Sequence, residues 1–360
     1  MGAEAHATGE RLRDAVDRIN RETDAQVRAW PADHPARRRW VVTAMLRRFA
    51  GRHGGDTDAA RLFCAGLAAF AAYLLHAKLW ERRRRIVAGA FEGATPARAD
   101  RRLPQVSAVV LTRNEASRIR RCLESLRWAG EVIVVDGESQ DGTPAIAQAC
   151  GARVVSRAFS GSYAEERNAG AAVARGSWVL QLDADEVVTE RFRQALEAAL
   201  RAQGEAMDAF KFQRRSVLLG RPMRHGGWVH YIPNLYRPDR VRYTGLVHER
   251  LEGAARLGVL EAPIDHYAME ALSPYLDTQN RYTTLSAQEL WRERGPLPWP
   301  RVREQLTRRP LKIFWKSYVK KQGFREDMHG VVLAILYGWV HFLTWAKYWE
   351  LVTERRDGSA

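Results

Sequence analysis

The sequence predicts an α/β protein in which a mostly parallel sheet is flanked by helices, with helical regions at both ends of the chain. One observation is that four short apolar runs of strand length alternate with helical stretches in the middle of the chain, at 106–111, 131–135, 152–155 and 178–182. This alternation is typical of βαβ units and a parallel sheet. The other observation is that the first 100 and the last 90 residues lack such runs, and their patterns predict helices broken by Pro and Gly.

These patterns divide the chain into an N-terminal helical extension (1–100), an α/β domain (104–265) and a C-terminal helical region (266–360). In the extension, helices are expected at about 9–29, 40–50 and 58–86, and the Gly- and Pro-containing stretch 91–103 is a linker. Between the strands of the α/β domain, helices are expected at 116–129, 143–149 and 163–174. In the C-terminal region, helices are expected at 272–293, 301–321 and 327–353.

Composition narrows the class of protein. The hydrophobic fraction is 46% and the charged fraction 28%, which excludes wholesale disorder and a polytopic membrane protein. The start of the chain has no basic segment followed by an apolar one, and the longest apolar run, Val331–Ala346, is shorter than the ~20 residues of a membrane span. The 57 Lys and Arg residues exceed the 42 Asp and Glu residues, for a net charge of +15, which favours anionic partners.

Polar side chains follow three of the four predicted strands, where ligands bind in parallel sheets. Asp183 and Asp185 are two residues apart at the end of an extended segment, so their carboxylates point the same way. Two adjacent carboxylates favour a hard divalent cation, which commonly bridges protein carboxylates to substrate phosphates. The first strand-to-helix turn lacks the glycines of a dinucleotide fingerprint, and neither a phosphate-binding P-loop nor a G-x-S-x-G nucleophile elbow is present.

Three motifs in this region resemble the family-2, inverting, GT-A-fold glycosyltransferases. They are Val-Val-Leu-Thr-Arg-Asn-Glu at 109–115, Val-Val-Asp-Gly-Glu-Ser-Gln-Asp-Gly-Thr at 134–143 and Leu-Gln-Leu-Asp-Ala-Asp-Glu at 180–186. The resemblance covers roughly 105–250 and implies a GT-A type sheet. Asn234–Arg237, Gly245–Glu249 and the aromatic-rich C-terminal end are similar to the subgroup that contains lipopolysaccharide-core β-glucosyltransferases. The first 100 residues depart from that subgroup.

The resemblance also implies roles for single residues. Six of them would bind a nucleoside-diphosphate sugar, most simply a UDP-sugar: Thr112, Arg113, Glu115, Asp136, Arg167 and Asp183. Asp185, with Asp183 and His248, would hold Mg²⁺ or Mn²⁺, although a buried structural role for His248 is an equal alternative. The general base that accepts the proton of the acceptor hydroxyl would be Glu249, with Glu186 as second candidate, and Glu249 could equally be a surface residue paired with Arg250.

The resemblance and the basic, aromatic C-terminal helices together predict where the protein works. We expect a glucosyl or other hexosyl transfer to a lipid-linked or lipopolysaccharide-core glycan. Trp and Tyr favour the membrane interface and Lys and Arg are attracted to anionic headgroups, so we expect a peripheral protein on the cytoplasmic face of the cell membrane. The alternative is a catalytically inactive module that binds membrane or nucleic acid, but the acidic strand ends do not suit a phosphate backbone, and no nucleic-acid partner is expected. The segment Val179–Val187 also resembles the phosphoaspartate motif of phosphatases of the haloacid-dehalogenase type. That interpretation is disfavoured, because the motif belongs on the first strand of its domain, whereas three predicted strands precede the segment here.

One internal repetition is visible in the helical regions. The segment Leu75–Glu81 resembles Leu343–Glu350, and an Asp precedes the shared Lys at the same separation in both copies, Asp58 before Lys78 and Asp327 before Lys347. The repetition indicates either a partial duplication of a helical cap or two amphipathic helix ends that share common residues.

Overall fold

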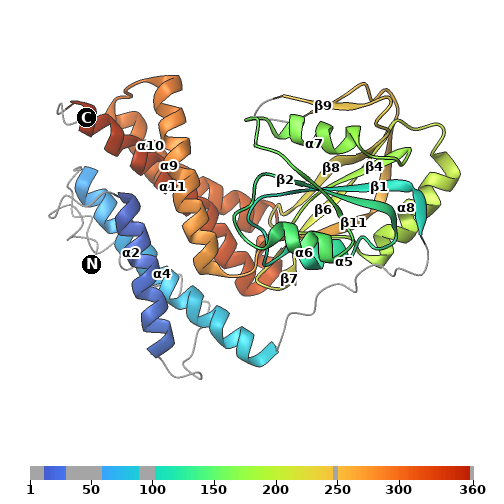
Figure 1. Ribbon diagram of the computed structural model, residues 1–360. Helices are drawn as coiled ribbons and strands as arrows, with labels where there is room; N and C mark the ends of the chain where they lie inside the picture. Colours follow the sequence, from blue (N-terminus) through green and yellow to red (C-terminus); the bar gives the residue numbers. More distant parts are fainter. Residues whose placement is uncertain (1–11, 30–58, 89–101, 246–249, 357–360) are drawn as a thin grey trace. The chain divides into compact units, whose positions relative to one another are not determined.

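The protein is described by a computed structural model that covers residues 12–29, 59–88, 102–245 and 250–356 (Figure 1). The chain forms two compact units. One is an α/β unit within residues 92–223 and 228–268, and the other is a helical unit that takes helices from both ends of the chain together with the short segment Arg224–Gly227. The expected fold class, a sheet flanked by helices with helical regions at both ends, is confirmed.

The first half of the α/β unit is built from parallel strands. The strands are β1 (Leu103–Thr112), β2 (Ala129–Asp136), β3 (Arg153–Ser156) and β4 (Trp178–Asp183). They lie in the order β3-β2-β1-β4, and every neighbouring pair is parallel. The connecting helices are α5 (Ile119–Glu124), α6 (Thr143–Ala149) and α7 (Tyr163–Ala172). This half matches the strands and helices that the sequence predicts, apart from a shorter α5.

The second half of the sheet has no counterpart among the predicted elements. After β5 (Glu186–Val187) and α8 (Glu190–Gln203), the chain adds six strands: β6 (Ala209–Leu218), β7 (Arg221–Pro222), β8 (Val229–Tyr236), β9 (Arg242–Thr244), β10 (Arg250–Glu252) and β11 (Leu257–Met269). The sheet continues β4-β8-β6-β11-β5, with β8 antiparallel to β4 and β6 antiparallel to β8. The strands β9 and β10 form a separate antiparallel pair. The complete sheet is therefore mixed, with its parallel strands at one side.

Close packing between α7 and the sheet depends on one glycine. A Cβ atom on Gly170 would lie 2.3 Å from a methyl carbon of Val109 in β1 and 2.9 Å from one of Val135 in β2. The absence of that atom lets the backbone of α7 approach the two central parallel strands, which are buried at these positions. The N-terminal half of α7, which carries Arg167, is thereby held over the strand ends.

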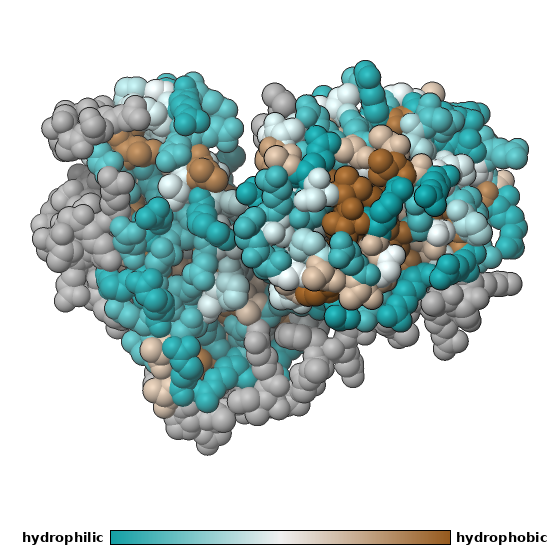
Figure 2. Space-filling model, in the orientation of Figure 1, coloured by the Kyte–Doolittle hydropathy of each residue, from teal (hydrophilic) through white to brown (hydrophobic). Residues whose placement is uncertain are grey.

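The helical unit contains α2 (Leu12–Ala29), α4 (Ala59–Ala88), α9 (Leu272–Arg294), α10 (Trp299–Trp315) and α11 (Asp327–Arg356). A π-helical turn (Lys316–Lys320) and a 3₁₀ turn (Gly323–Glu326) join α10 to α11. The five helices follow the predicted ones, whereas the helix expected at about 40–50 lies outside the described residues. Figure 2 shows a mainly hydrophilic outer face on this unit, consistent with helices that turn their apolar sides toward each other.

One segment of the helical unit, Gly323–Glu354, is long and apolar enough to cross a membrane. However, 78% of its most apolar stretch is buried inside the protein. A central helix of a packed bundle has the same composition, because it must be apolar on every side. The length of this helix therefore carries no argument for a membrane span.

Candidate active site

The register of the parallel strands brings three predicted site residues to one edge of the sheet. Thr112 at the end of β1 pairs with Asp136 at the end of β2, and Leu111 pairs with Asp183 at the end of β4. Thr112 and Asp136 are buried, whereas Arg113 is exposed beside them. The carboxyl ends of parallel strands are where α/β sheets bind their ligands.

The loops after β1 and β2 are joined by hydrogen bonds that fix their shape. Asn114 adopts a left-handed conformation with φ 58°, which Asn tolerates better than most residues. Its backbone N–H donates to Ser139 Oγ at 2.8 Å, and its side-chain oxygen accepts from the N–H of Gln140 at 2.8 Å. Asp136 accepts from both the N–H and the hydroxyl of Ser139, at 2.9 and 2.6 Å. The Asp136 carboxylate therefore orders the loop that frames the edge.

Asp183 lies between two arginines. Its Oδ1 accepts from Arg167 Nη2 at 3.1 Å, and its Oδ2 accepts from Arg214 Nη2 at 3.3 Å. Arg167 comes from α7 and Arg214 from β6, so the two halves of the α/β unit meet at this carboxylate. About a third of the Asp183 side chain is exposed (35%), so the ion pairs form at an accessible edge.

Asp185 lies next to a histidine and a third arginine. Its Oδ2 lies 3.3 Å from His266 Nε2 and 3.9 Å from Arg118 Nη1. Burial alone would raise the pKa of the Asp185 carboxyl, but the hydrogen bond and charge of His266, with Arg214 and Arg118, lower it overall. Glu115, which pairs with Arg118 at 3.7 Å, has a raised pKa because of burial, with Arg118 opposing the shift.

Glu186 is fully buried next to this edge. Its Oε1 lies 2.7 Å from Arg214 Nε, and its Oε2 accepts from the backbone N–H of Asp183 at 2.9 Å. Burial, reinforced by the charge of Asp183, raises the pKa of Glu186 to about 7. The side chain holds Arg214 and the turn after β4 in place, and it has no exposed surface through which to reach a substrate.

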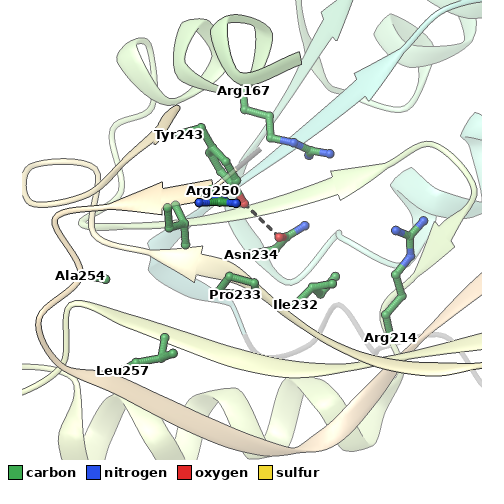
Figure 3. Close-up of a pocket in the computed structure, with 10 residues that line it drawn as sticks. Arg167, Arg214, Ile232, Pro233, Asn234, Tyr243, Arg250, Ala254 and Leu257 are labelled. Carbon is green, nitrogen blue, oxygen red and sulfur yellow. Dashed lines mark hydrogen bonds between the residues drawn. The ribbon is translucent and has the colours of Figure 1, made fainter. Parts of the chain in front are cut away.

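A pocket of about 570 Å³ lies beside the two arginines that hold Asp183 (Figure 3). Arg167 and Arg214 lie on one side of it, and Tyr243 donates its hydroxyl to Asn234 at 2.9 Å within it. The other lining residues are Ile232, Pro233, Arg250, Leu251, Ala254 and Leu257. Three guanidinium groups above an apolar floor suit a ligand with an anionic part and a less polar part.

Several of these residues were not predicted from the sequence. Arg118, Arg214 and His266 contact the acidic pair but lie far from it in the chain or outside any motif. Antiparallel pairing of β11 with β5 places His266 opposite Glu186, so only the pairing brings the imidazole to Asp185. Two predicted residues, His248 and Glu249, lie outside the described residues.

The cation-binding capacity of the edge can be judged from its donor atoms. Within the described ranges, no group of three His, Cys, Asp or Glu side chains is arranged to hold a metal ion. Asp185 and His266 are two suitable donors in contact, and both are partly exposed. A divalent ion that takes its remaining ligands from a diphosphate and water needs no more than one or two protein groups. The residues present therefore fit an ion that is shared with a substrate.

Comparisons with known proteins agree with the family resemblance. The family model described as "Glycosyl transferase family 2" matches residues 107–256. An "Uncharacterized glycosyltransferase" of Rickettsia felis is 23% identical over 270 residues, which cover 71% of this chain and 93% of the relative. The "Lipopolysaccharide core biosynthesis glycosyltransferase LpsC" of Rhizobium meliloti is 26% identical over 258 residues, which cover 68% of this chain and 92% of that relative. Among solved structures, S. aureus TarS 1–349 in complex with UDP matches with a TM-score of 0.35 and 17% identity, over 71% of this chain and 92% of that one.

Proposed function

Since this chain belongs to glycosyltransferase family 2 through its domain at 107–256, we propose that it transfers a hexose, by inversion, from a UDP-sugar or related nucleoside-diphosphate sugar to a lipid-linked or lipopolysaccharide-core glycan. The observation that carries the proposal is the pairing of Asp183 with Arg167 and Arg214, next to Asp185 and His266. This arrangement places cationic groups and a candidate metal-binding carboxylate at the ligand-binding edge of the sheet.

Arg167 and Arg214 would exchange Asp183 for the diphosphate when the nucleoside-diphosphate sugar binds. Each guanidinium now donates to an Asp183 oxygen, and a diphosphate offers oxygens of the same geometry with more charge. Negative charge grows on the departing diphosphate during transfer, so guanidinium N–H groups that already point toward it would stabilise the transition state. Glu186 keeps Arg214 in position through the 2.7 Å ion pair.

Asp185 and His266 would hold Mg²⁺ or Mn²⁺ together with the donor. When bound, the ion would neutralise charge on the leaving diphosphate. Arg118 lies 3.9 Å from Asp185 and 3.7 Å from Glu115, so its charge offsets the repulsion between the two carboxylates. Thr112, Arg113 and Glu115 on the first loop and Asp136 on the second would then line the nucleoside.

For the acceptor we propose the pocket lined by Arg167, Arg214 and Arg250. It adjoins the residues that would hold the diphosphate, and Arg250, the lining arginine not assigned to the diphosphate, suits an acceptor that carries phosphate or carboxylate groups. Glu249 would take the proton of the attacking hydroxyl. Glu186 would not, because it is fully buried and both of its carboxylate oxygens are engaged.

We also propose that the protein works on the cytoplasmic face of the cell membrane. Near the end of α10, Leu311 and Trp315 are 64% and 56% exposed, and Phe324 is 47% exposed. Exposed lysines lie among them at positions 312, 316 and 320. Apolar and aromatic side chains interleaved with lysines favour an anionic membrane surface.

The test is thermal unfolding with nucleoside diphosphates, with and without Mn²⁺. A ligand at a hundredfold excess over its dissociation constant raises stability by roughly 2.7 kcal/mol. We expect UDP with Mn²⁺ to raise the melting temperature, and His266→Ala to reduce the part of the shift that depends on Mn²⁺. His230→Ala, a change of another histidine in the same unit, is the control. If no nucleotide stabilises the protein, with or without metal, the proposal fails in favour of an inactive binding module.

A further inference from the structure

The repetition between the two ends of the chain extends over two pairs of helices. A constant shift of 260 positions superposes α2 on α9, and five residues are then identical: Leu12 and Leu272, Asp17 and Asp277, Asn20 and Asn280, Arg21 and Arg281, Thr23 and Thr283. A shift of 269 positions superposes α4 on α11 and matches Leu74, Ala77, Lys78, Trp80 and Glu81 with Leu343, Ala346, Lys347, Trp349 and Glu350.

Within each pair, the same buried lysine joins the two helices. Lys78 of α4 donates to the backbone oxygen of Asn20 at 2.8 Å and to its side-chain oxygen at 2.5 Å. Lys347 of α11 donates to the same two atoms of Asn280, at 2.6 and 2.5 Å. Two unrelated amphipathic helices would share apolar spacing, but not this specific Lys–Asn contact between corresponding atoms. The α2–α4 pair is therefore a second version of the α9–α11 pair.

The contacts between the two pairs are reciprocal. Asn20 Nδ2 donates to Ser273 O at 3.2 Å and to Asp277 Oδ1 at 2.7 Å. In return, Asn280 Nδ2 donates to Arg13 O at 2.9 Å and to Asp17 Oδ1 at 2.6 Å. Because Arg13 and Asp17 are the counterparts of Ser273 and Asp277, each pair makes toward the other the contact that it receives.

Two further contacts follow the same rule. The N–H of Leu12 donates to Glu350 at 2.8 Å, and the N–H of its counterpart Leu272 donates to Glu81 at 3.3 Å. Phe70 stacks on Trp339 with ring centroids 3.8 Å apart and planes 6° apart. Phe70 and Trp339 are counterparts under the 269 shift, and a residue meets its own counterpart only on a two-fold axis.

This pattern is that of a two-fold symmetric dimer interface, in which residue i contacts j and j contacts i. We infer that the face formed by α9 and α11 is a self-complementary interface for a second copy of this chain, and that α2–α4 occupies it from within the same chain. The intact chain is then a monomer, because its own N-terminal helix pair fills the place of the partner. In a dimer, Asn280 of each copy would donate to Asp277 of the other, and the Trp339 rings would stack on the axis.

The test displaces α2–α4 in the full-length protein. Asn20→Asp keeps the oxygens that accept from Lys78 but sets a carboxylate against Asp277, and adding Phe70→Asp places a second charge against Trp339. We expect the intact chain to have the mass of one 40.9 kDa chain in light scattering. We expect Asn20→Asp to show concentration-dependent association, and the Asn20→Asp, Phe70→Asp variant to have twice the mass of one chain.

The control adds Asn280→Asp and Trp339→Asp to the double variant, which removes the α9–α11 face and should restore the monomer. Leu285→Asp, at an exposed position of α9, should leave the double-variant dimer intact. In the double variant, Trp339→Cys should form a symmetric disulfide between two copies on oxidation, whereas Leu285→Cys should not. The inference is overturned if neither displaced variant dimerises, if only larger aggregates form, or if the dimer survives the loss of Asn280 and Trp339.

Discussion

Each unit of this protein holds a charged side chain through several polar contacts, but the two side chains differ in their exposure and in the charge of their partners. In the α/β unit, Asp183 is held by the side chains of Arg167 and Arg214, at an edge that remains accessible. In the helical unit, Lys347 is buried, and its Nζ lies within hydrogen-bond distance of four oxygens of a single helix, the backbone oxygen of Asn280 and the side-chain oxygens of Asn280, Thr283 and Thr284. The charged partners of Asp183 can exchange for an anionic ligand because the edge is accessible, whereas the neutral oxygens around Lys347 surround a group that is only 3% exposed. The first arrangement suits a site, and the second stabilises a fold.

The two buried lysines, Lys78 and Lys347, differ in the residue at one neighbouring position. Lys78 has Asp24 at 2.8 Å, whereas the counterpart of Asp24 next to Lys347 is the neutral Thr284. Burial lowers the pKa of Lys78, with Asp24 opposing the shift. Burial lowers the pKa of Lys347 to about 8, with the more distant Glu350 as the main opposing charge. Lys347 therefore lacks the adjacent carboxylate that opposes the downward pKa shift of Lys78.

The largest effect is expected at the accessible edge. Asp185→Ala should lower sugar transfer about a thousandfold, because it would remove the carboxylate that holds the charge-neutralising cation, and loss of such transition-state stabilisation typically costs two to three orders of magnitude. The melting temperature should fall only slightly, since the lowered pKa of Asp185 shows a favourable contact that is lost, but the partners left behind are partly exposed. Steady-state transfer with a UDP-sugar and thermal unfolding measure the two quantities.

A matched control for this change is Asp239→Ala, in the same unit, where the side chain is 66% exposed. It should leave transfer unchanged. Full turnover by the Asp185→Ala enzyme would show that this edge is not the site.

The next largest effect should be on the stability of the helical unit. Lys347→Met removes the ammonium group and leaves the buried oxygens around it without a donor, which costs about 1–3 kcal/mol. Lys78→Met should cost less than that, because its partner Asp24 is 30% exposed and can regain water. Urea unfolding followed by tryptophan fluorescence measures both. Arg281→Met, at an exposed position of α9, should leave the free energy of unfolding unchanged. Equal losses of stability in the Arg281 and Lys347 variants would contradict the stabilising role of the buried lysine.

A smaller effect is expected from pH through Glu186. Its folded-state pKa of about 7 lies above the 4.5 of an unperturbed glutamate, so the folded protein binds this proton more tightly than the unfolded chain does. The stabilisation of the folded state by this bound proton is complete below about pH 4.5 and is lost as the pH rises through 7. The slope is at most ~1.4 kcal/mol per pH unit. Glu186→Gln should flatten the pH dependence of stability between 5 and 7, as measured by denaturant unfolding. An unchanged profile would show that Glu186 ionises normally.

The smallest effect concerns membranes. Leu311→Ser with Trp315→Ser should weaken partition onto anionic vesicles roughly tenfold, because two exposed apolar side chains no longer leave water. Tyr282→Ser with Leu285→Ser removes similarly exposed apolar side chains from α9 and should have little effect. Vesicle co-sedimentation measures both. Equal partition of all variants would remove the proposed membrane contact.

The parallel half of the α/β unit was predictable because its signals are local. Each strand is a short apolar run that ends in polar residues, and each turn carries its own Asp, Asn, Ser or Gly, as at Asp136–Gly137. The antiparallel half was not predictable, since strands such as β8, with Pro233 and Asn234 in its middle, have no clear alternation. Their conformation depends on pairing with strands that lie far away in the chain.

The residues of the candidate site also separate into those that the sequence predicts and those that it does not. Local sequence was enough to assign Asp136, Asp183 and Asp185 to one sheet edge, because parallel strands carry their C-terminal residues to the same side. The side chains that face these carboxylates could be identified only from the packed fold, since Arg214 and His266 lie on antiparallel strands whose register no local pattern records. The same holds for the helical ends. Their repetition is visible as a short echo around Lys78 and Lys347, but reciprocity is a relation between contacts, and it exists only once the helices are packed.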